Sequence, residues 1–153
     1  MRIITIQNKK VSEIIRKEGI YVVDRDKSQY NSYGASYEKM RSLMGKHLNI
    51  KTLPIWGFLK IHDMTPSLDL NCPYYIGKGA IIDENSVLLE LEVDESMALI
   101  MDYYKWTDYM YFLGEGNTVK AEKSLSALFE IENADTIQVC IPYIKKSMLI
   151  CEC

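Results

Sequence analysis

The sequence has no apolar run that approaches the roughly 18 residues needed to span a bilayer. Its opening residues turn polar too soon for a secretory signal peptide, which needs a longer apolar segment and a small-residue cleavage site. It also has no internal repeat, no low-complexity tract and no linker rich in Pro, Gly or Ser. We therefore expect a cytoplasmic protein that forms one domain over residues 1–153.

Recognisable catalytic motifs are scarce as well. Two Gly-x-Gly segments, residues 77–79 and 114–116, lack the pattern of a phosphate-binding loop and do not join a strand to a helix. The Gly-x-Ser-x-Gly pattern of a serine nucleophile does not occur. The two histidines, His47 and His62, are too few for a histidine-based triad or a histidine-rich metal site. An enzyme is therefore the less favoured expectation.

Four cysteines, Cys72, Cys140, Cys151 and Cys153, are enough in number for two disulfides or a metal site. Without a secretory signal the expected compartment is reducing, and a chain of this length buries enough core to fold without disulfides. A bridge between Cys151 and Cys153 would be strained, and one Cys-x-Cys pair with two remote cysteines is poor zinc spacing. The sequence predicts free thiols, no metal and no cofactor.

The charge is unevenly distributed along a chain of ordinary globular composition, with 48% hydrophobic and 25% charged residues. Residues 1–60 hold 12 Lys/Arg and 5 Asp/Glu, whereas residues 61–153 hold 6 and 16, so a net charge of −3 conceals a basic and an acidic part. The basic part keeps a nucleic-acid-binding module open as an alternative. Because it contains no dense Lys/Arg run, mutual neutralisation is favoured and nucleic acid is not the expected partner.

Apolar periodicity predicts an α+β fold. Strands are expected over residues 2–7, 20–23, 55–61, 86–93, 97–101, 136–141 and 148–151. Helices are expected between Asn8 and Gly19, from Ser36 onward, over residues 103–113 and around residues 121–129, with loops over residues 24–34 and 62–85. Because the strands cluster without regular strand–helix–strand alternation, we expect a mixed, mainly antiparallel sheet with three to four helices.

Two features offer chemistry. Glu90 and Glu92 lie two residues apart on a predicted strand, so both carboxylates face the same side of the sheet. Such a pair binds a ribose, a cation or a catalytic proton in some proteins and forms a solvated sheet face in others. The six aromatic residues between positions 103 and 112 cannot all face inward on one helix. Some of them are expected to line a groove, a pocket rim or a partner surface.

Short motifs also follow one another along nearly the whole chain. They are Thr5-Ile6-Gln7, Gly19-Ile20-Tyr21, Pro54-Ile55-Trp56, Asp69-Leu70, Leu89-Glu90-Leu91-Glu92-Val93, Asp102…Trp106, Ser124…Phe129 and Ile137-Gln138. In these motifs the sequence resembles an uncharacterised bacterial family, domain of unknown function 3841, and the resemblance implies no activity. Members usually carry Arg, His and Trp where this chain has Asn71, Thr107 and Leu125. If those side chains carry chemistry in the family, this chain has lost it.

The order of elements is distantly similar to ADP-ribosyltransferase-like domains, which open with a strand, a helix and a glycine and end with a glutamate-bearing strand before a hairpin. This resemblance implies that Thr5 and Gln7 belong to the opening strand and that Gln138 replaces the glutamate. An amide cannot supply the negative charge that stabilises an oxocarbenium-like centre. The similarity is therefore one of topology, which does not confer function. An enzyme acting on NAD stays open as the first alternative, with NAD as a cofactor only in that case.

The candidate ligand site consists of the polar and aromatic members of the family-like motifs: Thr5, Gln7, Trp56, Asp69, Glu90, Glu92, Trp106 and Gln138. We expect Gln7 and Gln138 to converge with one of the two glutamates, because small-ligand pockets combine apolar walls with a few fixed polar groups. In the competing interpretation the tryptophans are core and the carboxylates are solvated. The leading hypothesis is a small intracellular binding or regulatory domain, an inhibitor being one form of it. Its partner is a protein or a small molecule, and its oligomeric state is left open.

Overall fold

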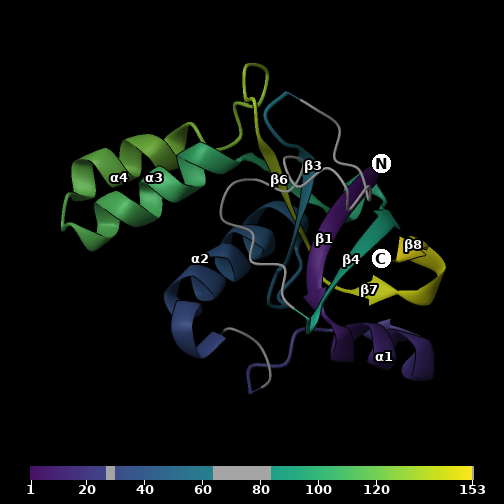
Figure 1. Ribbon diagram of the computed structural model, residues 1–153. Coiled ribbons are helices and arrows are strands. Elements are labelled where there is room, and N and C mark those ends of the chain that lie inside the picture. The colour runs from purple at the N-terminus through teal and green to yellow at the C-terminus, as the bar shows by residue number, and fades with distance from the viewer. Residues whose placement is uncertain (27–29, 64–83, 153) are drawn as a thin grey trace.

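The computed structural model of the protein describes residues 1–26, 30–63 and 84–152 (Figure 1). Its centre is a six-stranded sheet with the strand order β5-β6-β3-β1-β4-β8, in which every pair is antiparallel. The strands are β1 (Arg2–Asn8), β3 (Ile55–Lys60), β4 (Ser86–Glu92), β5 (Leu99–Asp102), β6 (Ile137–Ile141) and β8 (Leu149–Glu152). A second ladder pairs β2 (Ile20–Tyr21) with β7 (Ile144–Lys145).

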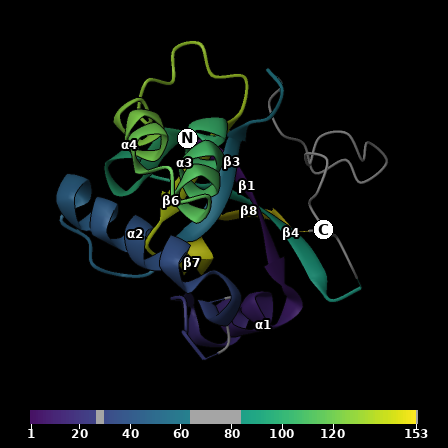
Figure 2. The ribbon, with the colours of Figure 1, turned by 90° about the vertical axis from the view of Figure 1, so that its left-hand side faces the viewer.

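The helices divide between the two faces of the sheet. The described residues form α1 (Lys9–Glu18), α2 (Tyr30–Leu48), α3 (Tyr103–Gly114) and α4 (Thr118–Ser126), with 3-10 turns η1 (Glu95–Met97) and η2 (Lys146–Met148). Figures 1 and 2 show α2 and the α3–α4 pair on one side of the strands and α1 with β7 on the other. The α+β class and the antiparallel sheet expected from the sequence are confirmed.

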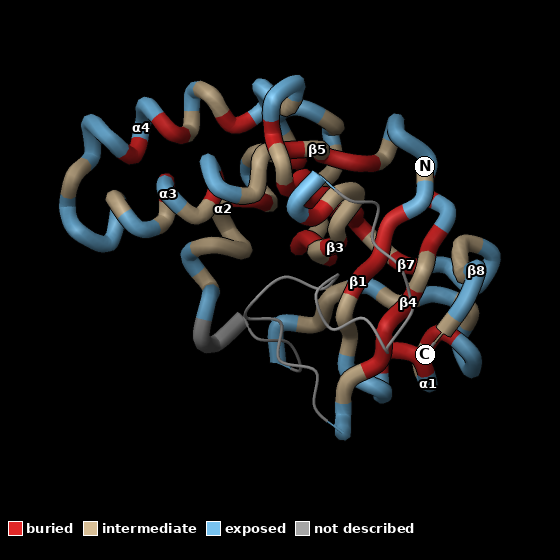
Figure 3. Tube along the Cα trace, turned by 45° about the horizontal axis from the view of Figure 1, so that its top comes forward, coloured by how far each residue is buried: buried red, intermediate tan, exposed pale blue. Residues whose placement is uncertain are grey.

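Residue alternation along the central strands separates two cores. Ile3 lies opposite Leu91 in the β1–β4 ladder, and both pack into the cluster that includes Val11 and Ile15 of α1. On the other side of the sheet, Met40 and Met44 of α2 pack with Met101, Trp106 and Tyr109. Figure 3 shows the buried positions concentrated along the strands between these helices. Because successive side chains of a strand point to opposite faces, β3 and β6 contribute to both cores, whereas Ile4 of β1 and Leu88 of β4 form a smaller third cluster.

Local sequence signals set the ends of α1 as expected. The side chain of Asn8 accepts a hydrogen bond from the backbone N–H of Lys10, which satisfies one of the unpaired donors at the helix start. Gly19 ends the helix at a φ of 81°, a left-handed conformation that glycine adopts without steric cost. Val11 and Ile15 form the buried stripe of this helix. The sequence therefore predicted α1 correctly because its signals lie within the twelve neighbouring residues 8–19.

Several elements differ from the sequence prediction, among them β2, which ends at Tyr21, and α4, which lies three residues earlier than expected. Helix α2 begins at Tyr30, inside the predicted loop, but Tyr33 breaks it with a φ of −129° and a ψ of 27°, so the expected helix corresponds to the part beyond this kink. The strand expected over residues 97–101 corresponds to β5, which starts only at Leu99. The residues before it form the turn η1, which the Asp94 side chain caps. The two-residue strand β7 was missed, since two residues cannot show a periodicity.

The close packing of β3 on β1 gives a testable consequence at Gly57. A Cβ atom added at Gly57 would lie 2.9 Å from Cδ1 of Ile3 and 3.2 Å from the backbone oxygen of Ile4. Because the sheet holds that oxygen in place, we expect Gly57→Ala to lower the free energy of unfolding by about 1–3 kcal/mol.

Gly114→Ala is the matched control, because an added Cβ at Gly114 meets no atom within 4 Å. The control should change the free energy of unfolding by less than about 0.5 kcal/mol. Urea denaturation measures both variants. Equal stability of Gly57→Ala and the unmodified protein would contradict the close approach of the two strands.

Candidate functional site

A groove runs between the beginning of α2 and the length of α3. Its outer part has a volume of about 380 Å³ and is lined by residues 33–36 of α2 and by Trp106, Thr107 and Met110 of α3. Its inner part, of about 200 Å³, is also lined by Tyr37 and Tyr103 and reaches the sheet at Trp56 and Gln138. The two parts share Tyr33, Ser36, Trp106 and Thr107. We treat them as one feature, the α2–α3 groove.

A series of aromatic rings walls this groove. Tyr37 meets Trp56 edge to face with 5.9 Å between the ring centroids, and Trp56 lies 5.8 Å from Trp106. Trp106 in turn stacks on Tyr109 at 5.6 Å. Offset and edge-to-face arrangements at these separations are favourable for aromatic side chains. Trp106, only 5% exposed, is therefore both a core residue and a wall of the groove.

The start of α3 places these rings. The Asp102 carboxylate caps the helix by accepting hydrogen bonds from the backbone N–H groups of Tyr104 and Lys105. From that start, Trp106 and Tyr109 come to face the sheet, whereas Tyr104 and Tyr111 are exposed. The expectation that these aromatic residues cannot all face inward is thus confirmed, and whether those outside the core contact a ligand or a partner stays a prediction.

Gln138 provides the polar group on the floor. Its strand neighbours are Phe58 of β3 and Met101 of β5, and its residue exposure is 7%. The Oε1 atom of Gln138 is buried and accepts no hydrogen bond from the described part of the chain. A buried oxygen without a donor costs about 1–3 kcal/mol relative to a paired one. Such an atom in a native structure calls for a physical explanation.

The described residues that line the groove carry no charge, and burial disfavours the ionised forms of the groups in and beside it. Burial raises the pKa of the Tyr37 hydroxyl above its usual value, although a side-chain hydrogen bond with Trp56 partly opposes the shift. Burial also raises the pKa of the thiol of Cys140, which lies opposite Trp56 in the β3–β6 ladder, well above its usual value. The described residues that line the groove contribute aromatic rings, methyl and thioether groups, hydroxyls and one amide.

Thr5 and Gln7 lie on the other face of the sheet. In the β1–β4 ladder they stand opposite Leu89 and Val87, which belong to the core covered by α1. The buried hydroxyl of Thr5 donates a hydrogen bond of 2.7 Å to the backbone oxygen of Trp56. It accepts one of 2.6 Å from Nε2 of Gln7. These two side chains therefore serve contacts between strands, away from the groove.

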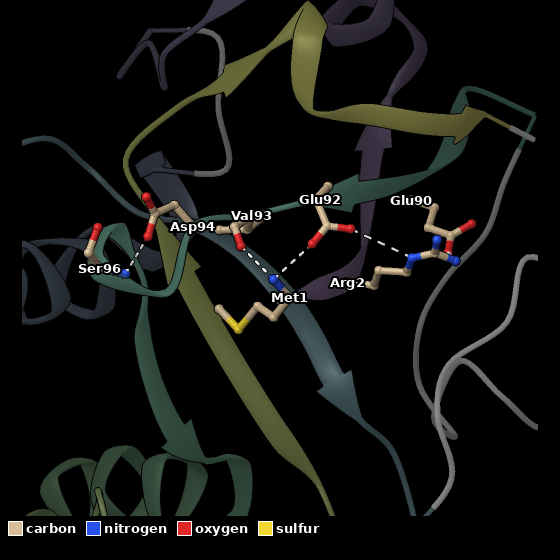
Figure 4. Close-up of polar contacts among 7 residues, drawn as sticks. All are labelled: Met1, Arg2, Glu90, Glu92, Val93, Asp94 and Ser96. Carbon is tan, nitrogen blue, oxygen red and sulfur yellow. Dashed lines mark hydrogen bonds and ion pairs between the residues drawn. The ribbon is translucent and has the colours of Figure 1, made fainter.

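Glu90 and Glu92 form ion pairs at the amino-terminal end of β1 (Figure 4). The amino group of Met1 lies 3.0 Å from Oε1 of Glu92 and donates a 2.7 Å hydrogen bond to the backbone oxygen of Val93. Arg2 lies 3.6 Å from Glu92 and 3.9 Å from Glu90. A hydrogen bond from the amino group of Met1 is the main cause that lowers the pKa of the exposed Glu92. The expected same-face orientation is confirmed, and Arg2 occupies that face.

The expected convergence of Gln7, a glutamate and Gln138 is therefore wrong. Gln7 points to the opposite face. Glu90 shares a face and a ladder row with Gln138, but Ile4 and Phe58 lie between them. With strands about 4.8 Å apart, three strand spacings separate the two residues by roughly 14 Å. Asp69 lies outside the described residues.

The structure brings together three of the predicted residues, Trp56, Trp106 and Gln138. Sequence reasoning missed the contribution of α2, because residues 33 and 34 fell in a predicted loop and no residue of the helix expected from Ser36 onward was a candidate for the site. A possible signal was the tyrosine-rich stretch before the helix. Whether the remaining predicted residues bind a ligand stays a prediction.

Comparison with known families then places the chain. The sequence profile of a family described as a domain of unknown function (DUF3841) matches residues 2–124. The chain belongs to this family. No curated protein and no solved structure matches the chain, so the distant similarity to ADP-ribosyltransferase-like domains is not shown. The matched residues include α2, β3 and α3 and thus every groove element except β6, which carries Gln138.

The positions at which the resemblance implies other residues in DUF3841 members are spread over the structure. Thr107 lines the groove, and Leu125 packs beside the core formed by α2, α3 and α4. Asn71 lies outside the described residues. Of the two positions that the structure describes, 107 is therefore the one at which the difference changes the lining of the groove.

Other sequence expectations concern metals, thiols and membranes. Cys140 and Cys151 are free thiols, whereas Cys72 and Cys153 lie outside the described residues. Within residues 1–26, 30–63 and 84–152, no three His, Cys, Asp or Glu side chains are grouped so that they could hold a metal ion. Over the same residues, no helix has the length and apolar character needed to cross a membrane.

The unpaired oxygen of Gln138 predicts the outcome of an apolar replacement. Gln138→Met keeps the length of the side chain and removes the unpaired amide, so the free energy of unfolding should stay the same or rise by about 1 kcal/mol. Thr5→Val is the matched control in the same sheet, because it removes two hydrogen bonds that are made.

That control should lower the free energy of unfolding by about 1–2 kcal/mol. Urea denaturation of both variants tests the difference. A Gln138→Met protein that is destabilised as strongly as Thr5→Val would show that the amide already has a partner.

Alkaline pH should destabilise the fold through two buried groups, the Cys140 thiol and the Tyr37 hydroxyl. Folding raises the pKa of the Cys140 thiol and the Tyr37 hydroxyl above their unfolded values of about 8.5 and 10. The contribution of each group to the free energy of unfolding is therefore fully present below its unfolded pKa. The free energy of unfolding then falls as pH rises from that value toward the folded pKa, by at most about 1.4 kcal/mol per pH unit and group. In urea denaturation from pH 7 to 11 with reductant, the loss should begin near pH 8.5. In Cys140→Ala it should begin near pH 10. The same onset in both proteins would contradict this account.

Proposed function

We propose that the protein is a small-ligand-binding domain and that the α2–α3 groove is its binding site. The observation that carries the proposal is the buried, unpaired Oε1 of Gln138 on the floor of an aromatic-walled hollow. Ligand pockets combine apolar and aromatic walls with a few polar groups that orient the ligand. A ligand that donates a hydrogen bond to this oxygen would account for a polar side chain in an otherwise apolar strand.

The chemistry of the lining supports binding rather than catalysis. The described residues around the groove include no carboxylate, imidazole or amine to exchange a proton with a substrate. An enzyme acting on NAD is the alternative to which we give less weight. Thr5 and Gln7 of the opening strand face away from the groove, and the late strand offers only the amide of Gln138.

The position of the groove supports a regulatory form of binding. The α2 and α3 walls belong to separate parts of the chain and contact one another mainly through side chains of the shared core. A ligand held between them would stabilise one arrangement of the two helices by mass action. A partner protein that contacts α2 and α3 would then respond to the ligand, which is one way for such a domain to regulate or inhibit.

The ion pairs support the proposal that the ligand is not a nucleic acid. Arg2 pairs with Glu90 and Glu92, and Arg16 lies 2.6 Å from Glu152. Basic residues of the first part of the chain are thus partly neutralised by acidic residues of the second part. Neutralised side chains attract a phosphate backbone only weakly.

Filling the groove tests its role. The Thr107 hydroxyl bonds only to the backbone oxygen of Tyr104 among the described contacts, so Thr107→Phe should preserve the fold while it occupies the groove. We expect this variant to bind 1-methylindole, a flat neutral probe, at least about tenfold more weakly, since steric overlap removes the ring's contact surface.

Val119→Phe is the control, a bulky change at an 80% exposed position on α4, outside the lining of the groove. Ligand-observed NMR titration measures the affinities, and thermal unfolding checks that both variants are folded. Equal affinity of Thr107→Phe and Val119→Phe, or no binding of any flat probe, indole included, to the unmodified protein, would refute the groove as the site.

A further inference from the structure

The unpaired atom in the groove is a hydrogen-bond acceptor. Oε1 of Gln138 is buried beside Phe58 and Met101, whose side chains offer no hydrogen-bond donor. A ligand without a donor would leave this oxygen unpaired and would enclose it further. A ligand with an N–H group would pair this buried oxygen, for which a missing partner is costly. The groove therefore favours ligands that carry a donor.

The lining also restricts the charge of the ligand. A charged group in the inner part would lose its hydration without gaining an opposite charge from the described lining residues. Aromatic walls do bind cations in some proteins. Here, however, Nζ of Lys39 lies 5.6 Å from the centroid of Tyr109, the ring that stacks on Trp106. This positive charge next to the aromatic series disfavours a second cation. Lys39 itself is not among the described residues that line the groove, so an anion in the inner part would stay unpaired, and the recognised group is neutral.

The shape of the walls favours a flat ring. Trp56 and Trp106 are inclined at 33° to each other on the sheet side, and Tyr33 and Tyr103 complete the inner part. A ring that enters must displace side chains above the covered oxygen of Gln138. Tyr33 is placed to move, since it is 59% exposed and lies at the kink of α2. Aromatic stacking then replaces the contacts that Tyr33 gives up.

We infer that the α2–α3 groove recognises a neutral, flat heteroaromatic ring through an N–H group that donates a hydrogen bond to Oε1 of Gln138. This inference rests on the proposed function and adds the chemical class of the ligand. Two sources share this chemistry, a nucleobase and an indole ring. Gln138 determines the specificity for the donor, whereas Trp56 and Trp106 supply affinity for any flat ring.

Matched pairs of probes test the donor. Indole and 1-methylindole have the same ring system and differ in the N–H group, and adenosine and N6,N6-dimethyladenosine differ in their exocyclic donors. With the unmodified protein, we expect the donor-bearing member of at least one pair to bind about tenfold or more tightly than its methylated partner. The pair that shows this preference identifies the source of the ring. Ligand-observed NMR titration at fixed pH and salt measures all four affinities.

Gln138→Met provides the matched protein, since it keeps the volume of the side chain and removes the acceptor. In this variant the preference for the donor should disappear, while the affinity for 1-methylindole should stay within about twofold. Thermal unfolding confirms that the variant is folded, and Thr107→Phe confirms that each probe binds in the groove.

The outcomes separate this inference from the proposed function. If 1-methylindole binds in the groove but neither pair shows a preference, the donor inference is overturned and the binding site stands. If no flat probe binds the unmodified protein, both are overturned. A preference that persists in Gln138→Met, or tighter binding of tetramethylammonium than of any neutral ring, also overturns the inference.

Discussion

The structure depends on the register of one strand, β6, which lies between the edge strand β5 and β3. Its five residues, Ile137–Ile141, are all buried, because the α1 core covers one face and the core of α2, α3 and α4 covers the other. Val139 and Ile141 point to the first core, whereas Gln138 and Cys140 point to the second. A one-residue slip would exchange these sets and move the amide into the α1 core. The packing of both layers therefore maintains the position of Gln138.

This constraint explains why a polar residue in β6 differs from the polar residues on the other strands. Thr5 is just as deeply buried, but its hydroxyl bonds to the backbone of Trp56 and to Gln7. Glu90 and Glu92 stand near the edge of the sheet, where Arg2 and solvent satisfy them. Oε1 of Gln138 has neither kind of partner among the described residues, and its side chain belongs to the lining of the groove. The proposed function follows from this contrast between satisfied and unsatisfied polar groups.

The groove also connects the stability of the fold with its function. The rings that wall it are continuous with the core, so Trp106 cannot be changed to probe binding without loosening α3. Thr107 and Gln138 are different, because one has a single local hydrogen bond and the other has none for Oε1. These two positions are where binding can be altered while the fold is kept. The DUF3841 resemblance places one of its differences, Thr107, at this same location.

Short-range signals determined much of this fold by themselves. Asn8 and Gly19 mark the ends of α1 through their own side-chain and backbone preferences, and the alternation in β4 shows that Glu90 and Glu92 share a face. The order of the strands in the sheet, and which residues lie opposite one another on neighbouring strands, depend on the tertiary structure alone. The sequence placed Gln7, Glu90 and Gln138 in one site because their motifs lie on strands, and a strand pattern contains no information about neighbouring strands. Pairing of β1 with β3, and of β3 with β6, separated them and placed Gln138 beneath two helices instead.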